Sequence, residues 1–185
     1  YGDHRDLHVR SRRQRQMCIR DSAGINATSQ LNAIKKFIEL NEVEKTIFLT
    51  PDVSFRNEIE KAISNSKIKL LENYIYNTEP TKLTKQIEKI TRYEIRKQNL
   101  EDEIIRLEKS KQNNKEYLIE RLKKRDTLGS LKFDSIVISD FDESLKSVTT
   151  SLLYTDISPK EKYFITLNQW FDESLLKETS SQPLY

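Results

Sequence analysis

Cysteine, histidine and methionine are absent from residues 23–185 of this 185-residue chain. Without cysteine, that part can form neither a disulfide nor a catalytic thiol, and without histidine it lacks the commonest general base and metal ligand. Ser-His and Cys-His nucleophile pairs are therefore excluded there. Glycine is scarce too, with only Gly24 and Gly129, which argues against a glycine-rich phosphate loop. We expect no metal site, no cofactor and no catalytic residues.

A long apolar run is also missing. No stretch approaches the roughly 18 apolar residues that a membrane span requires, so we expect no transmembrane segment in this chain. A secretory signal would need an apolar stretch of about 7 to 15 residues near the start, and none is there. A transit peptide would avoid acids, yet Asp3, Asp6 and Asp21 are present.

The first 22 residues differ from everything after them. They hold six arginines, both histidines, the only cysteine and the only methionine. "RRQRQ" and "MCIRD" can be encoded by CGT CGG CAG CGT CAG and ATG TGT ATA AGA GAC. Together with the preceding "YGDHRDLH" they resemble, in order and in one frame, a flow-cell primer, an index and a transposase adapter used in DNA sequencing. We interpret residues 1–22 as a translated adapter, disordered and outside the fold.

Removing this leader changes the charge balance. Its six basic and three acidic residues account for the whole excess, because 32 basic and 29 acidic residues become 26 of each sign. A neutral remainder gives no global attraction to nucleic acid or to an anionic membrane. A genuine arginine-rich arm that binds nucleic acid is the alternative interpretation of residues 1–22. We expect no nucleic-acid partner.

Helical and strand patterns alternate along residues 23–185. We predict helices over 30–40, 54–66 and 143–153, and strands over 45–50, 68–76, 133–139 and 162–167. Thr28 or Ser29 is expected to cap the first helix and Ser54 the second. Such alternation predicts the α/β class, with right-handed crossovers and a parallel sheet covered by helices on both faces.

One stretch, about 82–127, breaks this alternation. It is charged and helix-prone, and "KQNNKE" at 111–116 marks a turn. We predict a helical hairpin inserted into a crossover. Three apolar residues would face the sheet, namely Leu83, Ile87 and Ile90, and five would join the arms, namely Leu100, Ile104, Leu107, Leu118 and Leu122. Two interpretations stay open: a solvated spacer or a partner-binding surface.

Ligands of parallel sheets gather beyond the carboxyl ends of the strands. The residues of the loops there that could bind a ligand in a cleft are Asp52, Ser54, Asn77, Asp140, Asp142 and Trp170. Each also has a simpler explanation, since Asp, Asn and Ser commonly cap helices or form turns, and tryptophan commonly packs.

The stretch "SIVISDFDES" suggests one enzymatic alternative. An apolar strand followed by Asp-x-Asp resembles the first motif of haloacid-dehalogenase-like phosphatases. In that family Asp140 would attack phosphorus, and Asp142 would act as acid and base beside Mg²⁺. The mechanism also needs a later lysine and further acids, while only 41 residues follow Ser144.

Longer stretches carry a family resemblance. "RLKKRDTLGSLKFDSIVISD" (121–140) and "SLLYTDISPKEKYFITLNQWFDESLL" (151–176) resemble the penicillin-binding-protein activator family, which are periplasmic proteins with a type I periplasmic-binding-protein fold. "RYEIRKQNLEDEIIRLE" (92–108) is similar to the charged insertion of that family. Thr-Leu-Asn-Gln at 166–169 departs from the family's frequent Gly-Thr-Gly. Phe55-Arg56 replaces the Tyr-Gly of amino-acid-binding relatives, which removes a close backbone approach to a ligand.

The resemblance implies that residues 23–185 form most of the C-terminal lobe of a two-lobed periplasmic protein, with a lipid anchor as an option upstream. Its function would be non-catalytic: docking onto a peptidoglycan synthase, a penicillin-binding protein, and activating it. The alternative is a leucine-binding-like solute-binding subunit of an amino-acid ABC importer, holding a small amino-acid-like ligand with Ser54, Asp140 and Asp142. A haloacid-dehalogenase-like phosphatase is the third hypothesis.

Overall fold

The computed structural model describes residues 27–140, 142–167 and 182–185. Contacts between Cα atoms divide these residues into two compact units. The first contains residues 27–42 and 55–69, and the second contains 43–54 together with the described residues from Leu70 onward.

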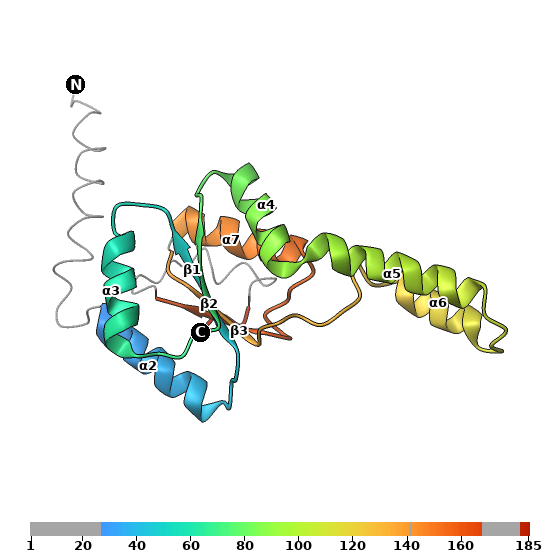
Figure 1. The fold of residues 1–185 in the computed structure, drawn as a ribbon, viewed down its shortest axis with the longest axis horizontal. Helices are drawn as coiled ribbons and strands as arrows, with labels where there is room; N and C mark the ends of the chain where they lie inside the picture. Colours follow the sequence, from blue (N-terminus) through green and yellow to red (C-terminus); the bar gives the residue numbers. More distant parts are fainter. Residues whose placement is uncertain (1–26, 141, 168–181) are drawn as a thin grey trace, which may run out of the picture. The chain divides into compact units, whose positions relative to one another are not determined.

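The second unit is built on a four-stranded parallel sheet (Figure 1). Its strands are β1 (Thr46–Pro51), β2 (Glu72–Tyr76), β3 (Ser135–Ile138) and β4 (Tyr163–Thr166), in the order β2-β1-β3-β4. All three pairings are parallel. Every residue of β1 and β3 is buried, as their nearly continuous apolar runs predict for central parallel strands. The predicted α/β class with a parallel sheet is confirmed.

The strand order places a topological switch between β1 and β3. From β1 the chain moves outward to β2 at one edge, then returns to the other side of β1. Residues at the chain's end continue this direction, because Leu184 bridges Phe164 in parallel. The Tyr185 amide donates to the Phe164 carbonyl at 2.8 Å, and the Thr166 amide donates to the Tyr185 carbonyl at 2.7 Å. The described end therefore lies where a fifth strand of the doubly wound order 2-1-3-4-5 would run.

Two helices of this unit, α4 (Pro80–Thr91) and α7 (Asp142–Tyr154), pack against each other and on the sheet (Figure 1). The core that they share with the strands includes Leu83 and Ile87 from α4, and Leu145, Val148 and Leu152 from α7. The predicted sheet-facing residues of α4 are therefore confirmed, with Ile90 partly buried beside them.

The helical hairpin is present where the sequence predicts it. Helices α5 (Tyr93–Glu108) and α6 (Lys115–Lys123) pack together and extend away from the sheet (Figure 1). The connection over 109–114 coincides with the predicted turn. Among the residues expected to join the arms, Leu100 and Leu107 are buried, while Ile104, Leu118 and Leu122 are half-buried. The first arm is not one helix, however, because Arg92 is left-handed, with a φ of 54°, and separates α4 from α5.

The first unit consists of α2 (Ala27–Leu40) and α3 (Arg56–Ser66), which pack on each other. Leu31, Ile34 and Ile38 are buried in α2, at the spacing of residues along one face of a helix.

Three sequence expectations about element ends are wrong. Thr28 and Ser29 do not precede α2 but lie in its first turn, because the described helix already includes Ala27, a strong helix former. Ser54 does not cap α3, since the Phe55 carbonyl accepts the first helical hydrogen bonds and makes Phe55 the N-cap. The strand expected over 68–76 starts only at Glu72, which pairs with Ile47, and the Leu71 amide just before it donates to the Thr46 carbonyl at 2.7 Å.

Candidate functional site

The carboxyl ends of the strands meet near Asp140, which lies two residues after the end of β3. Its side chain is buried, at 5% exposure. The Tyr76 hydroxyl, at the end of β2, donates a hydrogen bond to Asp140 Oδ2. The Ser144 hydroxyl, in the first turn of α7, donates to the same oxygen at 2.5 Å. One carboxylate thus joins an edge strand to the start of a helix.

The Tyr76 phenol is fixed as a donor in this arrangement. Burial raises the pKa of Tyr76 well above its ordinary value, and the charge and hydrogen bond of Asp140 raise the pKa further. The proton therefore stays on the phenol at neutral pH. The sequence did not point to Tyr76, because only residues of the loops after the strands were predicted to bind a ligand. The available signal was that Tyr76 is the last residue of one strand while Asp140 follows another.

Other polar groups at this edge also bond within the sheet. Thr50 Oγ1 donates to Asn73 Oδ1 at 3.0 Å. The hydroxyl of Ser139 donates to the Leu49 carbonyl at 3.0 Å. The first bond joins the end of β1 to Asn73 near the start of β2, and the second joins the end of β3 to β1, so side chains of the sheet itself fix these strands to one another.

The residues predicted to bind a ligand lie in different surroundings. Asn77 is exposed, and its Oδ1 accepts the Glu79 amide at 2.9 Å, which is turn chemistry ahead of α4. Asp52 and Ser54 are exposed in the connection after β1. Asp142 is the first residue of α7, and its side chain, like the whole of Trp170, lies outside the described part of the structure.

The chemistry open to Asp140 is limited by these contacts. A nucleophile must reach its substrate, whereas this carboxylate is buried and its Oδ2 already accepts two hydroxyl hydrogen bonds. Among the described residues, no group of three or more His, Cys, Asp or Glu side chains is arranged to hold a metal ion. The geometry gives Asp140 a positioning role at the start of α7.

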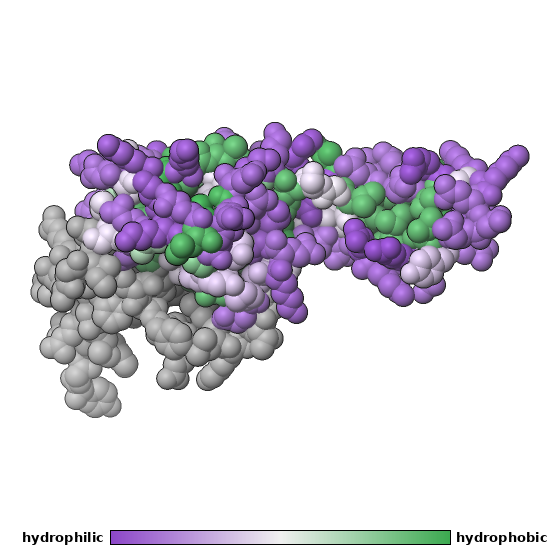
Figure 2. Space-filling view, turned by 90° about the horizontal axis from the view of Figure 1, so that it is seen from below, coloured by the Kyte–Doolittle hydropathy of each residue, from purple (hydrophilic) through white to green (hydrophobic). Residues whose placement is uncertain are grey.

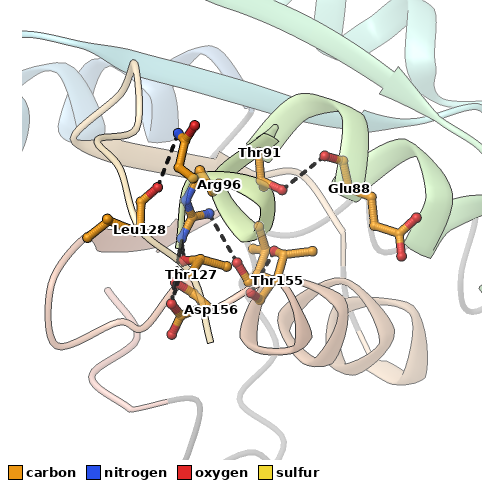
Figure 3. A network of polar contacts seen from close by, with 9 residues as sticks. Glu88, Thr91, Arg96, Thr127, Leu128, Thr155 and Asp156 are labelled. Carbon is orange, nitrogen blue, oxygen red and sulfur yellow. Dashed lines mark hydrogen bonds and ion pairs between the residues drawn. The ribbon is translucent and has the colours of Figure 1, made fainter. Parts of the chain in front are cut away.

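A second polar network holds the hairpin to the sheet unit (Figure 3). Its centre is Arg96 in α5, which is only 5% exposed. Nη1 donates to the Thr155 carbonyl at 3.1 Å, and Nη2 donates to Thr127 Oγ1 at 2.5 Å. Nη2 also donates to the Asp156 carbonyl at 3.2 Å and lies 3.7 Å from Asp156 Oδ2. Thr127 Oγ1 donates in turn to that carboxylate at 2.6 Å.

The charge of Arg96 is affected both by burial and by nearby carboxylates. Burial lowers the pKa of Arg96, while the nearby Asp156 and Glu161 carboxylates raise it. An arginine side chain nevertheless stays charged in proteins, so its buried charge must be compensated by neighbours. Asp156 and two backbone carbonyls supply that compensation.

The segment after α6 is fixed to the same helix through the backbone. The Leu128 amide donates to the Arg96 carbonyl at 2.9 Å, and Asn99 Nδ2 donates to the Leu128 carbonyl at 3.4 Å (Figure 3). Gly129 follows with a φ of +137°, and a Cβ there would lie 3.4 Å from Arg96 Cγ. Sequence reasoning missed Arg96 among many charged residues. The signal was its position four residues before the buried Leu100, on the same helix face.

In the described residues no helix is both long and apolar enough to cross a membrane.

Comparison with known proteins shows a likeness among solved structures. No family model matches the chain, and no curated protein matches it. Among solved structures, the chain is similar to an extracellular ligand-binding receptor from Verminephrobacter eiseniae ef01-2, with a TM-score of 0.45 and 7% identity. The likeness covers 76% of this chain and 30% of that receptor, so the chain spans less than a third of the receptor's length.

Proposed function

We propose that residues 23–185 form most of the C-terminal lobe of a non-catalytic, two-lobed protein in the bacterial envelope, and that this protein activates a peptidoglycan synthase. The proposal is supported by the order of the sequence stretches that resemble the penicillin-binding-protein activator family. The parallel sheet and the helical insertion both agree with it.

The observation that carries the proposal is the buried attachment of the hairpin. Arg96, in the stretch that resembles the family's insertion, bonds to Thr127, in a stretch that carries the same likeness. A spacer that only lengthened a crossover would not require a buried, charge-compensated arginine at its root, which is costly to desolvate. A projecting arm held in one orientation suits docking onto another protein.

The carboxyl edge of the sheet favours a protein partner over a small ligand. An amino-acid-binding site would hold the ligand's carboxylate and amine with hydroxyls, backbone donors and an acid. Here the acid Asp140 is buried and already accepts the hydroxyls of Tyr76 and Ser144. The importer subunit therefore stays second.

The test is the activity of a purified penicillin-binding protein from the same organism. We expect the full-length gene product to raise the rate of glycan polymerisation or crosslinking, whereas an unrelated periplasmic binding protein at equal concentration leaves it unchanged. No effect on any synthase would count against the activator. Tight binding of an amino acid in calorimetry would favour the importer subunit instead. Mg²⁺-dependent phosphatase activity that is lost in Asp140→Asn would favour the enzyme.

The proposed domain organisation has a separate test in the DNA. Sequence upstream of the codon for Ala23 in the source genome should encode a second α/β lobe preceded by a signal peptide, with a lipidated cysteine if the protein is anchored. A start codon directly before Ala23 would contradict the two-lobed, periplasmic arrangement.

A further inference from the structure

Helix α6 leaves most of its surface uncovered. None of its residues is buried, and only Lys115, Leu118, Ile119 and Leu122 are half-buried. Tyr117 is 67% exposed. A tyrosine ring combines a large apolar area with a polar hydroxyl, and tyrosine is enriched in the centres of protein interfaces. An exposed tyrosine on a projecting helix is therefore a candidate contact residue.

Two basic side chains share the face of Tyr117. Arg121 and Lys124 follow it by four and seven residues, which is the spacing of neighbours along one side of a helix. Both are exposed. Lys124 Nζ donates to Glu120 Oε1 at 3.1 Å, but such an exposed pair is weak and easily rearranged. We call Tyr117, Arg121 and Lys124 the Tyr117 face.

Positive charge is concentrated in the second arm of the hairpin. From the end of α5 to the residue before Thr127, over 109–126, seven basic residues stand against three acidic ones, a net charge of +4. Over α5 itself, 93–108, three basic residues stand against five acidic ones, a net charge of −2. In a chain that is neutral over 23–185, this arm would attract an acidic surface and speed its approach.

The helical hairpin is held rigidly enough to present this face. Its two ends near the sheet are joined, because Arg96 in α5 bonds to Thr127 and Leu128, which come just after α6. Along the arm, Figure 2 shows apolar residues lying between hydrophilic ones. A pre-organised helix loses little conformational freedom on binding, so its contacts contribute more fully to affinity.

We propose that the Tyr117 face is the docking surface for an acidic patch on the peptidoglycan synthase, with the tyrosine ring packed against an apolar site and the two cations paired with carboxylates. This inference rests on the proposed function. A protein surface fits better than an anionic membrane, because Glu116 and Glu120 are interspersed on α6. Helices that lie on membranes instead present a broad apolar face.

The test compares two variants of the full-length gene product in binding to the purified synthase. The first combines Tyr117→Ala, Arg121→Glu and Lys124→Glu. The control combines Lys61→Glu and Lys69→Glu, two exposed lysines outside the hairpin that carry the same change in charge. We expect the first variant to lose about tenfold or more in affinity, and the control to stay within about twofold of the unmodified protein. Circular dichroism should show both variants folded, since every substituted side chain is exposed.

The outcomes separate this inference from the proposed function. If the unmodified protein binds the synthase and the triple variant binds equally well, the Tyr117 face is not the docking surface while the activator function stands. If the unmodified protein binds no synthase, the proposed function fails and this inference with it. Binding of the unmodified protein to phosphatidylglycerol vesicles, lost only in the triple variant while synthase binding is unchanged, would assign the face to a membrane and overturn the proposal.

Discussion

At the scale of single residues, two buried polar side chains join separate segments of the second unit. Arg96 compensates its charge with Asp156 and with the carbonyls of Thr155 and Asp156. Asp140 accepts hydrogen bonds from the hydroxyls of Tyr76 and Ser144. Both side chains connect segments that are distant in sequence, so their loss is felt across the unit rather than locally.

Arg96→Met should lower the free energy of unfolding by about 2–3 kcal/mol, because the thioether fills similar space but leaves buried acceptors without a donor. Urea denaturation followed by circular dichroism measures this change. Arg106→Met is the matched control, since Arg106 lies in the same helix with its side chain 74% exposed and pairs with Glu103 at 2.6 Å. It should change the free energy by no more than about 0.5 kcal/mol. If the two substitutions changed the free energy of unfolding equally, the Arg96 network would not be a source of stability.

Tyr76→Phe should lower the free energy of unfolding by about 1–2 kcal/mol at neutral pH, because the buried Asp140 loses a donor. The pH dependence has a definite sign. Since folding raises the pKa of Tyr76 above its ordinary value of 10, the protonated phenol stabilises the fold fully below pH 10. That contribution is lost as the pH rises above 10.

Urea titrations at pH values on either side of 10 should therefore show the difference between the unmodified protein and Tyr76→Phe shrinking on the alkaline side. Tyr117→Phe serves as control because Tyr117 is largely exposed, and it should follow the unmodified protein at every pH. A difference that stays constant through this range would show that the phenol proton of Tyr76 is not linked to folding.

At the scale of elements, the hairpin is an addition to the sheet unit rather than part of its core. The shared core draws on the four strands, α4 and α7, and includes no residue of α5 or α6. The hairpin nevertheless has its own buried residues, Leu100 and Leu107. Its outer part should therefore unfold or be removed with little effect on the sheet.

Replacing residues 101–122 by a short Gly-Ser linker should leave a cooperative unfolding transition, with the free energy lowered by less than about 2 kcal/mol. The deletion keeps Arg96, Leu100 and Thr127, so the polar network at the root remains intact. Replacing 93–100 by a linker of equal length is the comparison, since it removes Arg96 and should cost more. Loss of cooperative unfolding in the first variant would mean that the hairpin and the sheet fold as one unit.

The sequence was sufficient to predict elements whose apolar spacing is decisive. The strands of the sheet, the helix α7 and the turn of the hairpin lie within a few residues of the predicted ranges, because periodic burial leaves a clear pattern. The helix break at Arg92 could not be predicted, since neither glycine nor proline marks it. The partners of Arg96 and Asp140 could not be predicted either, because they come from segments that only the tertiary fold brings together.

At the scale of the whole molecule, the fold depends on parallel strands that are joined by crossovers. The long crossover between β2 and β3 carries α4 and the hairpin, and β1 pairs with both strands. Such pairings join residues far apart in sequence, so the sheet forms only when most of the chain has collapsed. The leader of residues 1–22, interpreted as a translated adapter, should contribute nothing to this process.

Removal of residues 1–22 should leave the free energy of unfolding within about 0.5 kcal/mol of the full chain, as expected for residues outside the fold. Removal of residues 1–34 provides the contrast, because it also takes the buried Leu31 and Ile34 of α2. That deletion should destabilise the protein by several kcal/mol or prevent folding. A clear loss of stability on removing the leader alone would show that it is a native part of the protein.

The left-handed residue at Arg92 has a consequence for how this protein can vary. Because the bend lies where α4 ends, it sets the direction of the hairpin, and the lengths of α5 and α6 do not affect that direction. One helical turn added to both α5 and α6 would carry the tip outward by about 5.4 Å without altering any sheet contact. Relatives could thus fit partners of different size by changing the length of the hairpin alone.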